Sequence, residues 1–175
     1  VHDTFKALLA GMESIEQQLV AMVKPGVAYP DIHFATLNKI GQLLIDLDIC
    51  QGSLQNLMEL KIPHLFMPHG VGHLLGLQVH DVGGHQQDIA GTFLAPPADA
   101  PALRNTRELD TNMVFTIEPG CYFIPLLLEP VRNETRKEFI NWNLVDELYP
   151  CGGIRVEDNV LVTKDGFENL TRQFE

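Results

Sequence analysis

Apolar residues recur at three- and four-residue steps over the first part of the chain, which is the period of an amphipathic helix. Residues 3–23 follow this pattern, with Asp3 able to cap the first turn and the turn segment KPG directly after the last one. A second helix with one buried face is predicted to begin near Pro30–Asp31. A third, shorter helical segment covers residues 53–60. The pattern therefore predicts two long helices ahead of every strand.

From residue 63 onward the chain contains short segments of β-branched and apolar residues, which are typical of strands. Three such segments are MVFTI at 113–117, GIRVED at 153–158 and VLVT at 160–163. Apolar and charged residues alternate in GIRVED, as in a strand with one buried face. Residues 95–110 are rich in proline and predict a long loop, and residues 141–150 predict a short helix. We therefore expect an α+β domain with a mainly antiparallel sheet.

The composition fits one globular domain over residues 1–175. Lys and Arg number 12 against 23 Asp and Glu, which gives a formal net charge of −11. This acidic balance disfavours binding to nucleic acid and to anionic membrane surfaces, and no apolar run reaches the roughly 18 residues that span a bilayer. Cys50, Cys121 and Cys151 are widely spaced and form no CxxC pair. Reduced thiols in a cytoplasmic protein are the preferred interpretation.

Three histidines, His69, His73 and His80, lie among glycines in the segment PHGVGHLLGLQVHD at 68–81. The i, i+4 spacing of His69 and His73 would give a zinc-type pair on a helix. Each glycine disfavours a helix by about 1 kcal/mol, however, so the segment is predicted as a loop that enters a strand. Glycines there would let the backbone pass close to a bound group. The alternatives are acid/base catalysis and purely structural imidazoles held by hydrogen bonds.

Two glutamates occur within predicted apolar strands, Glu118 after VFTI and Glu157 near Arg155. A buried carboxylate is costly unless it is paired or bound to a metal. For Glu157 an ion pair with Arg155 is the simpler alternative. Carboxylate oxygens together with one imidazole favour a hard or borderline divalent ion such as Mn²⁺ over a thiolate zinc site.

The segments PHGVGHLLGLQVHD, TIEPG and GGIRVEDNVLVT, in this order, resemble the catalytic domain of the pita-bread metallopeptidases. The segments GLQVHDVGG and LRNTRELD are similar to those of the bacterial proline dipeptidases (Xaa-Pro dipeptidases, prolidases) in particular. The resemblance implies a creatinase/aminopeptidase-like pita-bread fold with helices packed on a curved sheet. It also implies hydrolysis of Xaa-Pro dipeptides by a metal-bound hydroxide, with two divalent ions, expected to be Mn²⁺, in the intact enzyme. The implied partners are a small peptide substrate and, in the full-length enzyme, a second copy in a homodimer.

Metal ligands follow from the resemblance residue by residue. His73 matches the ligand histidine, Glu118 the first ligand glutamate and Glu157 the glutamate that bridges both ions. The family also uses two aspartates, eleven positions apart, on a hairpin before the first helix. This chain opens with Val1 close to that helix, so we expect a catalytic domain truncated at its N-terminal side, without the N-terminal domain and the aspartate hairpin. Three aspartates with the same spacing follow the histidine segment instead and are interpreted as a coincidence: Asp88, Asp99 and Asp110.

Substrate-binding and catalytic roles are implied in the same way. His69 and His80 match the histidines that hold substrate and stabilise the reacting carbonyl, and Glu118 also matches the group that relays a proton. Arg155 matches a residue that binds the proline carboxylate, and Tyr29 matches an aromatic pocket wall.

Without the aspartates we expect this chain to hold one ion or none and to be inactive or weak. The alternatives are a proline-specific aminopeptidase of the same fold and a non-catalytic peptide-binding module. Organophosphate hydrolysis is an implied side activity.

Overall fold

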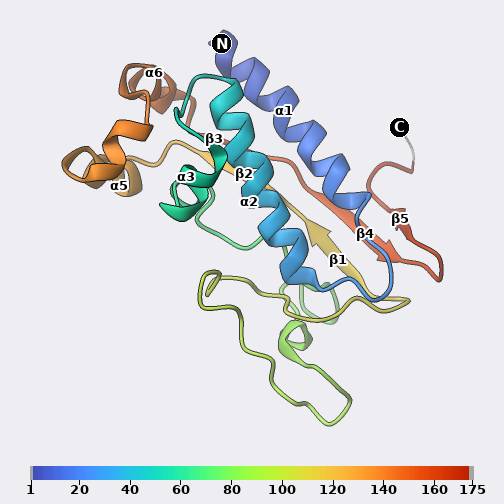
Figure 1. The fold of residues 1–175 in the computed structure, drawn as a ribbon. Coiled ribbons are helices and arrows are strands. Elements are labelled where there is room, and N and C mark those ends of the chain that lie inside the picture. Colours follow the sequence, from blue (N-terminus) through green and yellow to red (C-terminus); the bar gives the residue numbers. More distant parts are fainter. Residues whose placement is uncertain (1, 174–175) are drawn as a thin grey trace. The chain divides into compact units, whose positions relative to one another are not determined.

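The structure, a computed structural model, describes residues 2–173 (Figure 1). These residues form two compact units. The first unit contains residues 2–15, 37–68 and 120–155, and the second contains residues 16–36, 69–119 and 156–173. Helices α1 (Asp3–Val20) and α2 (Tyr29–Asp46) contribute residues to both units. Both helices confirm the periodic pattern, although α1 ends at Val20 rather than at residue 23.

Short helices make up much of the first unit. They are α3 (Leu54–Glu59), α4 (Pro63–Phe66), α5 (Pro125–Leu128) and α6 (Trp142–Leu148), with 3-10 helices η2 (Glu129–Asn133), η3 (Thr135–Phe139) and η4 (Tyr149–Cys151). The side chains of Ser53 and Asn141 each accept a backbone hydrogen bond from the first turn, and so fix where α3 and α6 begin. These two helices confirm the predictions for residues 53–60 and 141–150.

The first unit also contains a small antiparallel pair of strands, β2 (Gly120–Tyr122) and β3 (Gly153–Arg155). Cys121 lies opposite Ile154 in this pair, and both side chains are buried. The rings of Phe66 and Phe123 pack edge to face with centroids 6.0 Å apart. The apolar residues of the short helices thus share one core with the strand pair.

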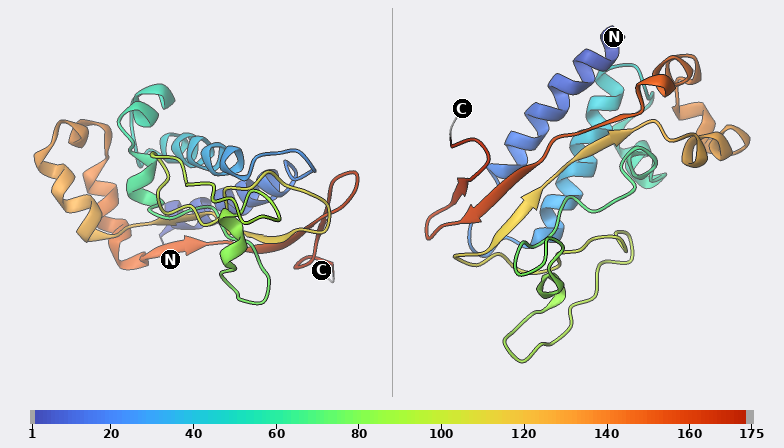
Figure 2. Two further views of the ribbon diagram at one scale, coloured as in Figure 1. Left: turned by 90° about the horizontal axis from the view of Figure 1, so that it is seen from below. Right: turned by 180° about the vertical axis from the view of Figure 1, so that it is seen from behind.

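The second unit is built on a three-stranded antiparallel sheet. Its strands, in the order β1-β4-β5, are β1 (Val114–Ile117), β4 (Asp158–Val162) and β5 (Phe167–Asn169). Figure 2 shows β1 in yellow and β4 in red running side by side. In the register of this pair, Phe115 lies opposite Val160. Both side chains are fully buried. The strands predicted at 113–117 and 160–163 are therefore confirmed.

The segment GIRVED does not form one strand. Residues 153–155 pair with β2, whereas Asp158 begins β4 in the other sheet. Val156 and Glu157 lie between these strands, where the Val156 N–H donates to the carbonyl oxygen of Pro119 (3.2 Å). The alternation predicted for this segment describes its burial correctly, but the chain passes from one sheet to another within it.

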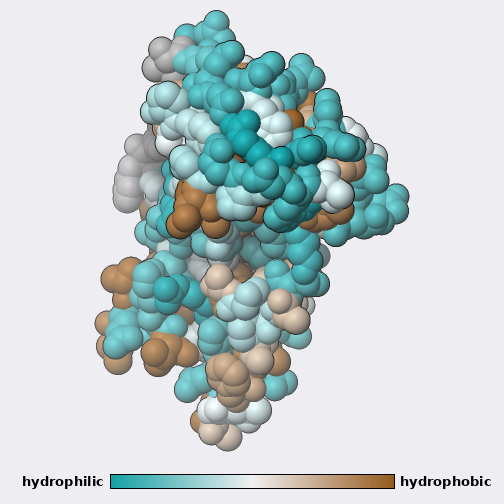
Figure 3. All heavy atoms as spheres, turned by 90° about the vertical axis from the view of Figure 1, so that its left-hand side faces the viewer, coloured by the Kyte–Doolittle hydropathy of each residue, from teal (hydrophilic) through white to brown (hydrophobic). Residues whose placement is uncertain are grey.

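Within the described residues no helix is long and apolar enough to cross a membrane. Figure 3 shows hydrophobic residues in separate patches among hydrophilic ones on the face turned to the viewer. Five large apolar side chains between residues 77 and 93 are about two-thirds exposed or more: Leu77, Val79, Val82, Ile89 and Phe93.

Candidate metal and substrate site

The histidine segment runs antiparallel beside β1. The Thr116 N–H donates to the carbonyl oxygen of His73 (3.0 Å), and the Glu118 N–H donates to that of Val71 (2.7 Å). Leu74 forms a single β-bridge in this pairing, so the segment is a short extension of the sheet rather than a full strand. This pairing is what places the imidazole of His73 next to the carboxylate of Glu118.

His73 and Glu118 form a buried pair, with exposed fractions of 4% and 6%. His73 Nε2 lies 3.4 Å from Glu118 Oε1. His73 Nδ1 lies 3.2 Å from the carbonyl oxygen of Leu74, which can only accept, so Nδ1 carries a proton. Nε2 then directs its lone pair toward Glu118 Oε1. Two ligands of one ion at bond lengths near 2.1 Å lie roughly 3.0–3.5 Å apart, so this pair fits a divalent ion.

Gly72 allows this close packing. A Cβ at this position would lie 2.2 Å from the carbonyl oxygen of Thr116 and 2.4 Å from the hydroxyl of Tyr29. The glycine was expected to let the backbone approach a bound group, and in the structure it lets the backbone approach β1 and Tyr29.

Tyr29 supports β1 from the core. Its hydroxyl donates to the carbonyl oxygen of Thr116 (2.6 Å), and its ring packs edge to face on Phe115. Burial, with a smaller contribution from the negative charge of Glu118, raises the pKa of Tyr29 well above the ordinary tyrosine value, so the hydroxyl remains a donor. The side chain has no exposed surface, so the predicted role as a pocket wall is corrected to a supporting one.

His80 lies against the buried pair and opens onto a cavity. Its ring meets that of His73 edge to face, with centroids 4.4 Å apart. The cavity has a volume of about 440 Å³ and is also lined by His85, Phe93 and Arg104. His69, the third predicted histidine, is half-buried, and its Nδ1 lies 2.7 Å from the carbonyl oxygen of Gly70.

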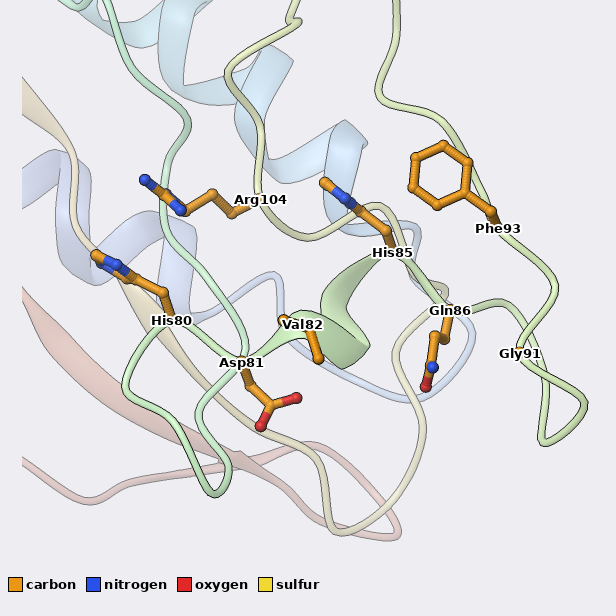
Figure 4. A pocket seen from close by; sticks show the side chains of 8 residues that line it. All are labelled: His80, Asp81, Val82, His85, Gln86, Gly91, Phe93 and Arg104. Carbon is orange, nitrogen blue, oxygen red and sulfur yellow. The ribbon is translucent and has the colours of Figure 1, made fainter.

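Arg104 is a candidate site residue that the sequence analysis missed. Figure 4 shows its side chain and that of His80 extending toward the same side of the cavity. Arg104 is exposed between buried Leu103 and Asn105, which directs it away from the core. Its positive charge, within the proline-rich loop of an acidic chain, was the feature that could have suggested Arg104 from the sequence. The sequence does not indicate, however, that this loop folds back onto the segment that contains His80.

Glu157 and Arg155 differ from the expected environment. Glu157 was expected in a buried strand, but it is exposed in the short connection between β3 and β4, so that expectation is wrong. Arg155 belongs to the first unit, where its Nε donates to the hydroxyl of Tyr122 (2.6 Å). Over residues 2–173 no group of three or more His, Cys, Asp and Glu side chains is arranged to hold a metal ion. Of the three predicted ligands, the structure brings His73 and Glu118 together.

Asp88 does not point to a second ligand set. Its carboxylate accepts hydrogen bonds from the Thr92 hydroxyl and from the backbone N–H groups of Ala90 and Thr92. These bonds, the hydroxyl first, lower the pKa of Asp88. The carboxylate thus stabilises its own exposed turn, in agreement with the interpretation of the aspartate spacing as a coincidence.

Comparison with known proteins identifies the family of this chain. The model of metallopeptidase family M24 matches residues 2–164. The chain belongs to this family. It is 52% identical over 170 residues to an Xaa-Pro dipeptidase of Shewanella piezotolerans, covering 97% of this chain and 39% of that protein. An Xaa-Pro dipeptidase of Shewanella pealeana is 50% identical, with 96% of this chain and 38% of that protein covered. This M24 chain therefore spans under two-fifths of the length of these relatives.

Solved structures agree with the family. Aminopeptidase P from E. coli with the inhibitor Pro-Leu has a TM-score of 0.72 and 26% identity, covering 99% of this chain and 32% of that one. Zn-substituted E. coli aminopeptidase P in complex with product has the same TM-score and identity, covering 100% of this chain and 32% of that one. The predicted pita-bread fold is confirmed, and the family is one of metal-dependent peptidases.

Proposed function

We propose that this chain is part of an Xaa-Pro dipeptidase, which hydrolyses the peptide bond before a C-terminal proline. The buried pair of His73 and Glu118 carries this proposal, because it offers two ligand atoms at the separation that one divalent ion requires. Relatives named Xaa-Pro dipeptidase are about half identical to this chain, against 26% for the aminopeptidase P structures. A dipeptidase is therefore favoured over an aminopeptidase of the same fold.

His73 and Glu118 would hold the ion, with Glu157 as a further ligand, and we infer that the metal is Mn²⁺. Such an ion would supply Lewis acidity to water and to the scissile carbonyl. His73 Nδ1 donates to the Leu74 carbonyl and so directs Nε2 toward Glu118 Oε1, where it would be available as a ligand. Two buried metal ligands are few, so we expect this chain alone to bind the ion weakly and to be weak or inactive as a catalyst.

The remaining residues would act directly on the peptide. Glu118 accepts a proton from the attacking water and passes it to the leaving proline nitrogen. His80, exposed beside His73, donates a hydrogen bond to the carbonyl oxygen as negative charge develops on it. His69 and Arg155 hold the C-terminal carboxylate, and Arg104, which shares the cavity with His80, adds a guanidinium suited to the same group. Binding of the C-terminal carboxylate would explain a preference for dipeptides.

Hydrolysis of Ala-Pro and of the tripeptide Ala-Pro-Ala by the longer protein that contains this chain, with Mn²⁺ present, tests the proposal. We expect Ala-Pro to be the better substrate and Glu118→Gln to lower kcat by about a hundredfold or more. Glu59→Gln, at an exposed glutamate of α3, is the matched control and should leave kcat unchanged. Preference for the tripeptide would indicate an aminopeptidase, and a protein that binds Mn²⁺ and cleaves neither peptide would indicate a peptide-binding module.

Titration of the purified chain with Mn²⁺ by calorimetry tests the metal centre separately from hydrolysis. Binding that is present in this chain and absent in His73→Ala would support a preformed part of the site. The same Mn²⁺ affinity in the unchanged chain and in His73→Ala would exclude His73 as a ligand.

We also infer a cytoplasmic location and, for the full-length enzyme, a homodimer. The three cysteines are free, and burial raises the pKa of Cys50 and Cys121, which keeps both as neutral thiols. Sedimentation of the longer protein would test the dimer. Hydrolysis of organophosphates stays a prediction.

A further inference from the structure

His85 ends the 3-10 helix η1 (Val82–His85) and joins two segments of the long loop. Its Nε2 lies 2.9 Å from the carbonyl oxygen of Leu103. Because a carbonyl oxygen can only accept, Nε2 carries a proton and donates it in this bond. The ring of Phe93 meets the imidazole edge to face, with centroids 5.5 Å apart and planes at 86°. A polar contact and an aromatic contact together hold the imidazole in one orientation.

The peptide that accepts this hydrogen bond leads directly into Arg104. The Arg104 backbone also packs against η1, because a Cβ added to Gly84 would lie 2.3 Å from the Arg104 carbonyl oxygen. The Thr106 N–H donates to the carbonyl oxygen of Gly84 (2.9 Å). The backbone of this segment is thus fixed on η1, while the Arg104 side chain extends into the cavity with His80 (Figure 4).

The same short helix carries His80 at its other end. Asp81 is the N-cap of η1, and its carboxylate accepts a hydrogen bond from the Gly83 N–H (2.8 Å). His80 immediately precedes this cap. Helix η1 therefore connects the two groups that face the substrate cavity, and His85 is the side chain that ties it to the Arg104 loop.

We propose that His85 is a positioning residue that fixes Arg104 relative to His80. This inference rests on the proposed function, in which Arg104 binds the substrate's C-terminal carboxylate. A guanidinium–carboxylate pair depends on orientation, because two parallel N–H···O bonds form only when both planes are aligned. Release of the Leu103 carbonyl therefore weakens carboxylate binding more than it slows cleavage of the bond.

The experiment compares His85→Leu and His85→Gln in the Mn²⁺-loaded longer enzyme. Free proline and prolinamide serve as competitive ligands, because prolinamide lacks the carboxylate. We expect His85→Leu to raise KM for Ala-Pro and Ki for proline about fivefold, as loss of one hydrogen bond predicts, with kcat and the prolinamide Ki unchanged. His85→Gln, whose amide can donate to the same carbonyl, should restore both constants. His2→Leu, the same substitution in the first unit, should have no effect.

Several results would overturn the inference. Equal weakening of proline and prolinamide, or a loss of kcat alone, would mean that His85 only maintains the fold. If His85→Leu does not fold, Phe93→Leu removes the aromatic contact with the imidazole and should shift the proline Ki in the same direction. Arg104→Gln separates this inference from the proposed function. If the ratio of the Ki values for proline and prolinamide is unchanged in Arg104→Gln, the role of Arg104 itself is refuted. If that ratio changes in Arg104→Gln but not in His85→Leu, only the inference about His85 is refuted.

Discussion

The hydroxyl of Thr116 ties His73 to Glu118. Its Oγ1 accepts a hydrogen bond from the backbone N–H of His73 (3.0 Å) and donates one to the carboxylate oxygen Oε1 of Glu118 (3.1 Å). Thr116 is 1% exposed, so neither bond competes with water. A single buried side chain on β1 thus holds the backbone of His73 and the carboxylate of Glu118.

Thr116→Val should remove both bonds while it keeps the shape of the side chain. We expect the free energy of unfolding to fall by about 1–3 kcal/mol, because a buried N–H and a buried carboxylate oxygen each lose a partner. Metal affinity should fall about 10- to 100-fold, as for other residues that orient metal ligands. Urea denaturation and Mn²⁺ calorimetry measure the two effects. Thr36→Val is the control, since the buried Thr36 hydroxyl donates only to a helix carbonyl, and an equal loss of affinity there would contradict the role of Thr116.

Gly72→Ala should be strongly destabilising. The new methyl group would overlap the Thr116 carbonyl oxygen and the Tyr29 hydroxyl, which are themselves joined by a hydrogen bond. We expect a loss of about 1–3 kcal/mol in the free energy of unfolding, the usual cost of overpacking. Gly166→Ala is the matched control, because a Cβ there meets nothing within 4 Å. Equal urea midpoints for the two variants would show that β1 can move away from the histidine segment at little cost.

The sequence predicted the elements whose signal is local. The apolar stripes of α1 and α2 and the β-branched residues of β1 and β4 each act over one element, so their pattern can be read directly. Helices α4 and α5 span four residues each, which is too short for a helical period to be visible.

The parts of the site that the sequence missed depend on contacts between distant segments. The alternation of apolar and charged residues in GIRVED could not indicate that the chain leaves one sheet before Glu157. Strands β3 and β4 both have the two-residue period of a strand, so the pattern does not change where the chain passes between sheets. Nothing around Tyr29 indicates that its hydroxyl is satisfied by Thr116, 87 positions away. Arg104 becomes a candidate only once η1 packs against its backbone. The motif residues His73 and Glu118 were identified from the sequence, but their mutual distance follows from the sheet.

Alkaline conditions should reveal the buried thiol of Cys121. Burial raises its pKa from 9.0 to about 12 in the folded protein. Between these values the unfolded chain releases the thiol proton and the folded chain keeps it, so the stabilising effect is complete below pH 9 and is lost as the pH rises toward 12. Cys121→Ala should therefore make the decline of the unfolding free energy less steep by about 1.4 kcal/mol per pH unit in this window. Urea denaturation at several pH values measures the slopes, which should be parallel below pH 8, and parallel slopes above pH 9 as well would refute the prediction.

Arg172 should be essential for the stability of the second unit, because its guanidinium contacts two buried carboxylates. It donates to Glu16 Oε2 (3.2 Å) and to Asp158, whose side chains are almost fully buried. Arg172→Ala removes a cation shared by both and should lower the free energy of unfolding by about 3–5 kcal/mol, the cost of breaking a buried ion pair from one side. Arg172→Lys keeps the charge but cannot reach both carboxylates in the same geometry, so its loss should be smaller. Arg136→Ala, which removes a surface pair with Glu134, should cost no more than about 1 kcal/mol. Urea denaturation compares all three variants, and equal losses for Arg172→Ala and Arg136→Ala would mean that water replaces the guanidinium at Glu16 and Asp158.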